Sequence, residues 1–265
     1  MPQRIKNTQL FLFDMDGTLY LGNQLFPFTK DLLAEIKKQG KKHLFMTNNS
    51  SKSVDAYIEK LNKLGIDACY DDFITSSQAT AYYLKENHWG ARLYVCGTTS
   101  FKEELRKNGF TVTENPQETD CIVSGFDTEL TFKKLADISE MLCTRDLPYI
   151  ATNPDYVCPT EFGSVPDCGS MADMIFNATG KRPLFIGKPS PLMPQLAMKK
   201  WGVPPEHTAV VGDRIYTDIK SGLNAGILSV LVMSGETTQE ILDNSEYKPH
   251  IVLESGKEIL DILQG

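Results

Sequence analysis

The sequence predicts an α/β protein in which parallel sheets are covered by helices. Short apolar runs of strand length alternate with segments of helical periodicity along almost the whole chain, which is typical of this class. Several of these runs are followed at once by polar clusters, as expected where strands end at a ligand-binding edge. The chain of 265 residues, 41% hydrophobic and 23% charged, can bury one sizeable core or two smaller ones.

The N-terminal part predicts three strands and two helices. A continuous apolar run at 10–13 is followed by apolar residues at helical spacing that stop at Gly40, a usual helix C-terminus. A second helix is expected to begin at Ser53, a suitable N-cap, and to stop at Gly65. The expected strands are 10–13, 44–46 and 73–75, and the expected helices begin near 28 and 53.

The C-terminal third repeats this alternation. Strands are expected at 184–186, 208–211 and 228–232, with a helix opened by Ser190 and Pro191, and we expect them to complete the first sheet. The stretch between the two parts has strands and helices of its own, which is too much for one crossover. Its expected strands are 93–96, 121–124 and 149–151, and its expected helices are 100–108, 131–144 and 169–179.

This pattern predicts a discontinuous core with a second domain inserted in it. The core would comprise residues 1–80 and 184–265, and a smaller α/β domain would comprise 81–183.

Composition argues against several classes of protein. A net charge of −7 disfavours binding to nucleic acid, which needs clustered Lys and Arg. No apolar run of 18 residues predicts a membrane span, and residues 1–9 lack the apolar stretch of a secretory signal, so we expect a cytoplasmic protein. The six cysteines form no Cys-x-x-Cys pair and the four histidines lie far apart, so a zinc site is not expected.

The strongest local signal follows the first strand. Asp14 and Asp16 are spaced i and i+2 on an extended backbone, so both carboxylates can face one ligand, and Gly17 lets the chain turn away. An EF-hand loop needs Gly at its sixth and Glu at its twelfth position, where this chain has Leu19 and Leu25. Standing alone, the stretch could also be an Asp-rich turn.

Three further polar clusters each follow a predicted strand. Thr47, Asn48 and Asn49 offer short hydroxyl and amide groups suited to phosphoryl oxygens, although such a run is usually a turn. Lys188 offers a compact ammonium, although most single lysines are solvated. The last cluster, Gly212 to Asp218, adds two carboxylates, Asp213 and Asp218. We expect all of these groups to gather at the same edge of the same sheet.

Several carboxylates at one edge require a cation. Each close pair of like charges costs roughly 4 kcal/mol at an effective dielectric constant of about 20. Oxygen ligands with room left for substrate and water favour Mg²⁺ over zinc, which prefers His or Cys.

The four motifs together resemble those of the haloacid dehalogenase superfamily. Asp-x-Asp-Gly-Thr, Thr-Asn-Asn, Gly-Lys-Pro and Gly-Asp-x-x-x-Thr-Asp occur here in that order. The chain is most similar to the NagD-like, or para-nitrophenyl phosphatase-like, subfamily, on the strength of 47–50, 151–155 and 186–191. The resemblance implies a Rossmann-like, doubly wound core with an α/β cap between the second and third motifs. One departure is Pro166 to Gly169, where relatives usually carry Pro-Gly-x-Gly.

The resemblance also implies roles for individual residues. Asp14 would be the nucleophile and Asp16 the general acid and base, while Mg²⁺ would be bound by the Asp14 carboxylate, the Asp16 carbonyl and Asp213, with Asp218 in support. Gly17, Thr47, Asn48, Asn49 and Lys188 would bind the phosphoryl group. In the cap, Asn153 and Asp155 are candidates for substrate contacts or, alternatively, parts of a Pro-braced turn.

The expected function is Mg²⁺-dependent hydrolysis of small phosphorylated metabolites through an aspartyl-phosphate. The alternatives are a phosphomutase or phosphotransferase of the same superfamily and a non-catalytic sensor of phosphorylated metabolites. A homodimer is compatible with the subfamily. The sequence does not choose among sugar phosphates, sugar-acid phosphates, phosphoglycolate, nucleoside monophosphates and pyridoxal phosphate.

Overall fold

The structure, a computed structural model, describes residues 2–160 and 162–265, which form two compact units. Unit 1 comprises the described chain up to Thr47, together with Ile58–Ile74 and Lys188–Gly265. Unit 2 comprises Asn48–Tyr57 and Thr75–Gly187. Each unit is built on its own sheet.

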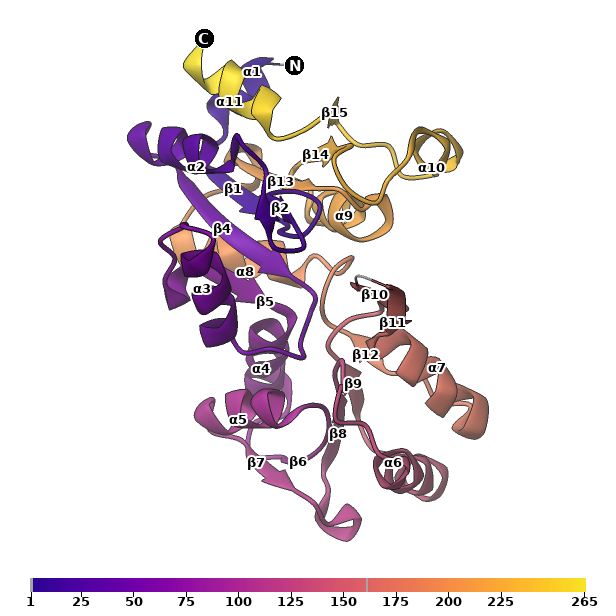
Figure 1. Ribbon diagram of the computed structural model, residues 1–265. Coiled ribbons are helices and arrows are strands. Elements are labelled where there is room, and N and C mark those ends of the chain that lie inside the picture. Colours follow the sequence, from indigo (N-terminus) through magenta and orange to yellow (C-terminus); the bar gives the residue numbers. More distant parts are fainter. Residues whose placement is uncertain (1, 161) are drawn as a thin grey trace. The chain divides into compact units, whose positions relative to one another are not determined.

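The sheet of unit 1 has the order β15-β14-β13-β1-β4-β5, and its first four pairings are parallel. Its strands are β1 (Leu10–Phe13), β4 (Lys42–Thr47), β5 (Phe73–Thr75), β13 (Thr208–Gly212), β14 (Leu228–Val232) and β15 (Ile251–Leu253). The chain runs from β1 through β4 to β5 on one side, whereas β13 to β15 lie on the other. Figure 1 shows β1 and β13, from opposite ends of the sequence, side by side. The order of the strands therefore reverses between β1 and β13, where a doubly wound sheet binds ligands.

The central strands of unit 1, β1, β13 and β14, are buried because helices pack against the sheet. All four residues of β1 are fully buried, as expected for a central parallel strand. Helix α11 packs against α1 and α2, and α8 packs against β1 and α9. The helices are α1 (Pro2–Asn7), α2 (Thr29–Lys38), α8 (Leu192–Trp201), α9 (Lys220–Ala225), α10 (Gln239–Asn244) and α11 (Lys257–Gln264), and β2 (Tyr20–Leu21) and β3 (Gln24–Leu25) form a hairpin. Helix α3 (Val54–Lys63) is divided, with residues 54–57 in unit 2 and 58–63 in unit 1.

Unit 2 has a parallel sheet of order β12-β9-β8-β6-β7. Its strands are β6 (Arg92–Cys96), β7 (Thr111–Thr113), β8 (Cys121–Ser124), β9 (Tyr149–Ala151) and β12 (Leu184–Phe185), and β10 (Val157–Thr160) pairs with β11 (Gly163–Pro166) as a separate antiparallel hairpin. Its helices are α4 (Ser76–Asn87), α5 (Thr99–Lys107), α6 (Phe132–Thr144) and α7 (Cys168–Thr179). The inner faces of α6 and α7 share an apolar cluster with β6, β8 and β9.

The predicted α/β class is confirmed, but one strand was assigned to the wrong sheet. The strand expected at 184–186 is β12, which pairs with β9 in unit 2, Leu184 opposite Ile150, instead of completing the first sheet. A two-residue strand with Leu184 half exposed carries no pattern that identifies its partner. The predicted domain division stays a prediction, and its border at residue 80 falls inside α4.

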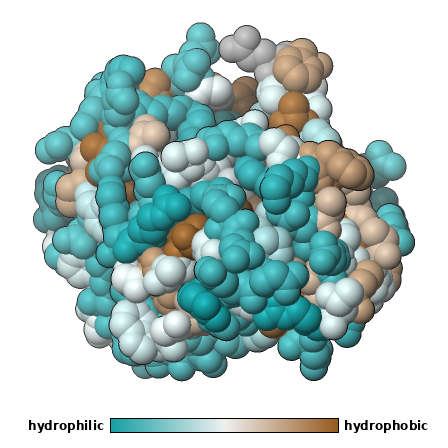
Figure 2. All heavy atoms as spheres, turned by 90° about the horizontal axis from the view of Figure 1, so that it is seen from below, coloured by the Kyte–Doolittle hydropathy of each residue, from teal (hydrophilic) through white to brown (hydrophobic). Residues whose placement is uncertain are grey.

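The described surface is mainly hydrophilic. The face in Figure 2 is mostly teal with scattered brown patches, in keeping with the charged fraction of the sequence. Within residues 2–160 and 162–265 we find no helix with the length and apolar character needed to cross a membrane.

The contact between α9 and β13 provides a test of the packing in unit 1. A Cβ added at Gly222 would lie 2.3 Å from Cγ1 of Val210. Replacing Gly by Ala inside a helix ordinarily raises the free energy of unfolding by up to about 1 kcal/mol. Because of this contact, we expect Gly222→Ala to lower the free energy of unfolding by about 1–3 kcal/mol in a urea titration. A variant more stable than the wild type would contradict this packing.

Candidate active site

Asp14 lies at the end of β1, the strand at which the order of the sheet reverses. Its backbone N–H donates to the carbonyl of Val211 in β13 at 2.9 Å, so the hydrogen bonding of β1 continues one residue past the strand. The apolar residues of β1 are fully buried, whereas the Asp14 side chain keeps 15% of its surface exposed. Its carboxylate is therefore open to a ligand outside the sheet.

The turn after Asp14 brings its backbone against a second carboxylate. Gly17 has φ of +85°, and a Cβ there would lie 2.5 Å from Oδ2 of Asp213. Both the left-handed backbone and the close approach therefore require glycine. Asp16, in the same turn, has an exposed side chain whose Oδ1 accepts from the backbone N–H of Gly22 at 3.5 Å.

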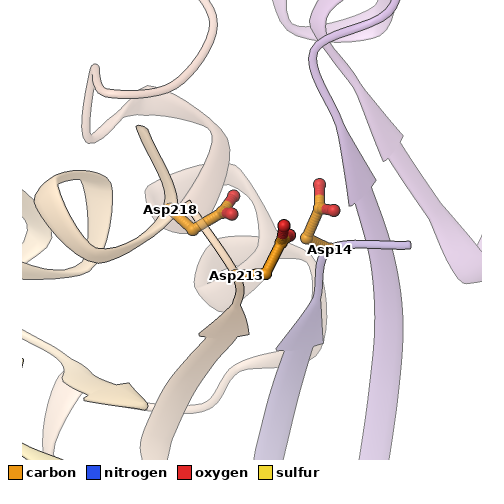
Figure 3. A group of neighbouring side chains, drawn as sticks. All are labelled: Asp14, Asp213 and Asp218. Carbon is orange, nitrogen blue, oxygen red and sulfur yellow. The ribbon is translucent and has the colours of Figure 1, made fainter. Parts of the chain in front are cut away.

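Two further carboxylates come from the segment after β13. Asp213 follows the strand directly, and Asp218 lies in a π-helical turn, Ile215–Ile219; both are buried. Oδ2 of Asp218 accepts from the backbone N–H of Arg214 at 3.0 Å. Figure 3 shows the carboxylates of Asp14, Asp213 and Asp218 close together, and one oxygen from each lies within 4.8 Å of the other two.

Lys188 supplies the positive charge in this cluster. Its Nζ donates to Oδ1 of Asp14 at 2.6 Å, to Oδ1 of Asp218 at 2.6 Å and to the carbonyl of Met46 at 3.2 Å. The Lys188 side chain is 4% exposed. The ammonium thus connects the ends of β1 and β4 with the turn that carries Asp218.

Burial raises the pKa of two of these carboxyl groups. It raises the pKa of Asp14 to about 7 despite the attraction of Lys188, and the charges of Asp218 and Asp213 add to the increase. Burial, followed by the charge of Asp218, raises the pKa of Asp213 to about 6. Burial lowers the pKa of Lys188, but Asp14 and Asp218 outweigh it, so that pKa is raised and the ammonium stays protonated.

The cluster suits a divalent cation bound through oxygen. Three ionised carboxylates and one ammonium would leave two negative charges in a buried place. Ionisation of buried carboxyl groups near like charges is unfavourable, and the raised pKa values of Asp14 and Asp213 reflect this. A hard cation such as Mg²⁺ prefers carboxylate and carbonyl oxygens. Asp14, Asp213 and Asp218 are the carboxylates gathered to hold it, and the part of the Asp16 carbonyl stays a prediction.

The comparisons with known proteins identify the family. The model of haloacid dehalogenase-like hydrolases matches residues 11–111, and the model described as HAD-hydrolase-like matches residues 185–259. An acid sugar phosphatase from Staphylococcus aureus is 34% identical over 245 residues, which are 92% of this chain and 94% of the relative. The chain belongs to the haloacid dehalogenase-like hydrolases.

Solved structures of similar phosphatases span nearly the whole chain. The 4-nitrophenylphosphatase of Thermotoga maritima has a TM-score of 0.92 and 38% identity, covering 99% of this chain and 98% of its own. NagD from E. coli has a TM-score of 0.85 and 29% identity, covering 94% and 96%. The glycerol phosphate phosphatase of Mycobacterium tuberculosis, solved in complex with magnesium, has a TM-score of 0.89 and 28% identity, covering 98% and 78%. The NagD-like resemblance and the Rossmann-like fold are confirmed, and the chain is a phosphatase.

In the phosphatase, the Thr-Asn-Asn cluster is divided between the two units. Thr47 is buried at the end of β4, beside β1 in unit 1. Asn48 begins unit 2, where its Nδ2 donates to Oδ2 of Asp155 at 3.0 Å. Oδ1 of Asn49 accepts from the backbone N–H and the hydroxyl of Ser51 at 2.9 and 2.8 Å. The phosphate-binding role of these residues stays a prediction.

The two cap candidates lie in a buried polar network of unit 2. Nδ2 of Asn153 donates to Oδ2 of Asp155 at 3.3 Å and to Oδ1 of Asp167 at 3.2 Å. Asp167 in turn caps α7, and a Cβ at Gly169 would lie 2.2 Å from the carbonyl oxygen of Pro154. These contacts favour the alternative of a Pro-braced turn, and the departure at 166–169 is part of it.

Sequence reasoning missed the loop that follows β14. Gly235 and Glu236 lie against the Asp213 carboxylate: Glu236 donates its backbone N–H to Oδ2 at 2.7 Å, and a Cβ at Gly235 would lie 2.0 Å from that oxygen. A polar run after the apolar strand, separated from it by Met233, is the signal that the sequence carries for this loop, and it does not single out Glu236.

We expect the raised pKa values to make stability depend on pH and on a divalent cation. Burial raises the pKa of Asp14 to about 7 and that of Asp213 to about 6 in the native state, from an ordinary pKa of 3.8. Because the native state binds more protons in this window, their contribution lowers the free energy of unfolding as pH rises from about 4 to about 7. A divalent cation should oppose this loss, most strongly above pH 7.

Thermal melts at pH 5 and pH 8, each with chelator or with MgCl₂, would measure both effects. The control is Asp213→Asn, which cannot ionise at that position and should lose most of the stabilisation by cation. Equal gains from MgCl₂ in the wild type and in Asp213→Asn would contradict the assignment of Asp213 to the cation site.

Proposed function

We propose that this phosphatase hydrolyses small phosphorylated metabolites with Mg²⁺, through an aspartyl-phosphate formed on Asp14. The observation that carries the proposal is the direct hydrogen bond between Lys188 and Asp14, in a cluster of three carboxylates at the reversal point of the sheet. A nucleophile, a fixed positive charge and oxygen ligands for a cation are the components that phosphoryl transfer requires.

In the first half-reaction, a carboxylate oxygen of Asp14 attacks phosphorus as the ester P–O bond breaks. The leaving alcohol takes a proton from Asp16, whose carboxyl group must be protonated before this step. Lys188, already 2.6 Å from Asp14, holds negative charge near the transferring oxygens. Bound Mg²⁺ would supply further neutralisation of that charge.

In the second half-reaction, Asp16 removes a proton from water, which attacks phosphorus and breaks the bond to Asp14. The products are inorganic phosphate and the regenerated Asp14 carboxylate. The exposed position of Asp16 supports this role, because the residue must exchange its proton first with an alcohol and then with water.

Sugar phosphates are the substrate class that we propose, with para-nitrophenyl phosphate as an artificial substrate. The support comes from the relatives described above, an acid sugar phosphatase, a 4-nitrophenylphosphatase and a glycerol phosphate phosphatase. All three names describe phosphatases acting on small phosphate esters. The cytoplasmic location and the homodimer stay predictions from the sequence.

Replacement of the nucleophile should abolish activity. We expect Asp14→Asn to lower the rate of para-nitrophenyl phosphate hydrolysis by at least about a thousandfold, because an amide oxygen is a poor nucleophile. Chelation of divalent cations should lower wild-type turnover to a similar background, and added Mg²⁺ should restore it. Turnover by Asp14→Asn at the wild-type rate would refute the mechanism.

Replacement of the general acid and base should impair both half-reactions. We expect Asp16→Asn to transfer phosphate to Asp14 slowly and to hydrolyse the aspartyl-phosphate about 10²- to 10⁴-fold more slowly than the wild type. Quenched-flow trapping of the phosphoenzyme and release of inorganic phosphate measure the two steps separately. Unaltered steady-state turnover would exclude this role, and phosphate recovered on an added alcohol instead of water would indicate a phosphotransferase.

A further inference from the structure

Glu236 lies in the loop that follows β14 and contacts the site through its backbone. Its N–H donates to Oδ2 of Asp213 at 2.7 Å, which fixes one face of that carboxylate. The neighbouring residues hold the loop close: Ser234 Oγ donates to the carbonyl of Gly17 at 2.7 Å, and Gly235 leaves no room for a Cβ beside Asp213. The position of this loop therefore decides where the Asp213 oxygens point.

The side chain of Glu236 ties the same loop to the segment that carries Asp218. Oε2 of Glu236 lies 2.8 Å from Nε of Arg214, and Oε1 accepts from the hydroxyl of Tyr216. The ion pair is partly buried, with the Arg214 and Glu236 side chains 20% and 35% exposed. The backbone N–H of Arg214 in turn donates to Oδ2 of Asp218 at 3.0 Å. One residue thus connects the surroundings of both carboxylates.

We propose that Glu236 is a positioning residue for the cation site, which holds the loop after β14 in the place that orients Asp213. The inference rests on the proposed function, because it requires Asp213 to bind a divalent cation. Groups that orient metal ligands through hydrogen bonds commonly change metal affinity about 10- to 100-fold when they are replaced.

The negative charge of Glu236 also favours cation binding at Asp213. Arg214 directly follows Asp213 in the chain, so its positively charged guanidinium lies on the segment that carries this carboxylate. Glu236 pairs with this guanidinium and partly neutralises it. Without Glu236, the positive charge of Arg214 would compete more strongly with a cation for Asp213.

A purely structural role for Glu236 leads to a different expectation. If the ion pair only stabilised the fold locally, its removal would lower the melting temperature equally with and without Mg²⁺. The affinity for Mg²⁺ would then be unaltered. A positioning role changes the affinity itself, and a high Mg²⁺ concentration compensates for it. The Mg²⁺ dissociation constant is therefore the measurement that decides.

The experiment compares Glu236→Ala and Glu236→Gln with the wild type by calorimetric titration with MgCl₂ and by para-nitrophenyl phosphate hydrolysis over a range of Mg²⁺. The control is Glu240→Ala, which removes the same charge from an exposed position in α10. We expect Glu236→Ala to bind Mg²⁺ about tenfold more weakly, with kcat at saturating Mg²⁺ within about twofold of the wild type. Glu236→Gln, which loses the charge but keeps one acceptor, should lie between, and Glu240→Ala should match the wild type.

The outcomes separate this inference from the proposed function. If the wild type binds Mg²⁺ and both Glu236 variants bind it equally well, the positioning role is wrong and the proposed function stands. If the wild type binds no Mg²⁺, the cation site is refuted and the inference with it. Should Glu236→Ala fold poorly, Glu236→Gln still decides, because an unaltered Mg²⁺ affinity in that variant would overturn the inference.

Discussion

The structure depends on the attraction between one buried ammonium and the carboxylates around it. Lys188 lies 2.6 Å from both Asp14 and Asp218, and it offsets part of the repulsion among three acidic groups gathered at one place. Burial, together with the like charges nearby, raises the pKa values of Asp14 and Asp213, so Lys188 alone does not offset the cost of ionising all three carboxyl groups. This excess of negative charge suits the cluster to a divalent cation, which is the basis of the function that we propose.

Such a cluster forms only because backbone approaches the carboxylates without side chains in the way. A Cβ at Gly17 or Gly235 would come within 2.5 Å of an Asp213 oxygen, and a Cβ at Gly212 would lie 2.4 Å from the Asp218 carboxylate. Each of these glycines stands at the end of a strand or in the turn after one. The Asp-Gly, Gly-Asp and Ser-Gly pairs of the sequence are therefore packing requirements of the site as much as turn signals.

The topology of the sheet explains why these residues meet. Because β1 and β13 are neighbours at the point where the strand order reverses, Asp14 and Asp213 leave the sheet side by side although 199 positions separate them in the sequence. Unit 2 repeats a parallel design with the order β12-β9-β8-β6-β7, and polar residues after β9 are used there for its own buried network around Asn153. Similar local patterns thus serve a reactive cluster in one unit and a structural one in the other.

The sequence by itself determined the α/β class, most of the strands and the residues that end them, since buried parallel strands are continuous apolar runs and the acidic groups follow them directly. It did not determine the partner of β12, because a strand of two residues, one of them half exposed, fits the edge of either sheet. Nor did it reveal Glu236, whose hydrogen bond to Asp213 comes from its backbone and carries no residue preference. Only the tertiary structure decided which polar clusters come together. Contacts between distant segments join the carboxylates, the ammonium and the loop beside Asp213, and local sequence patterns do not encode such contacts.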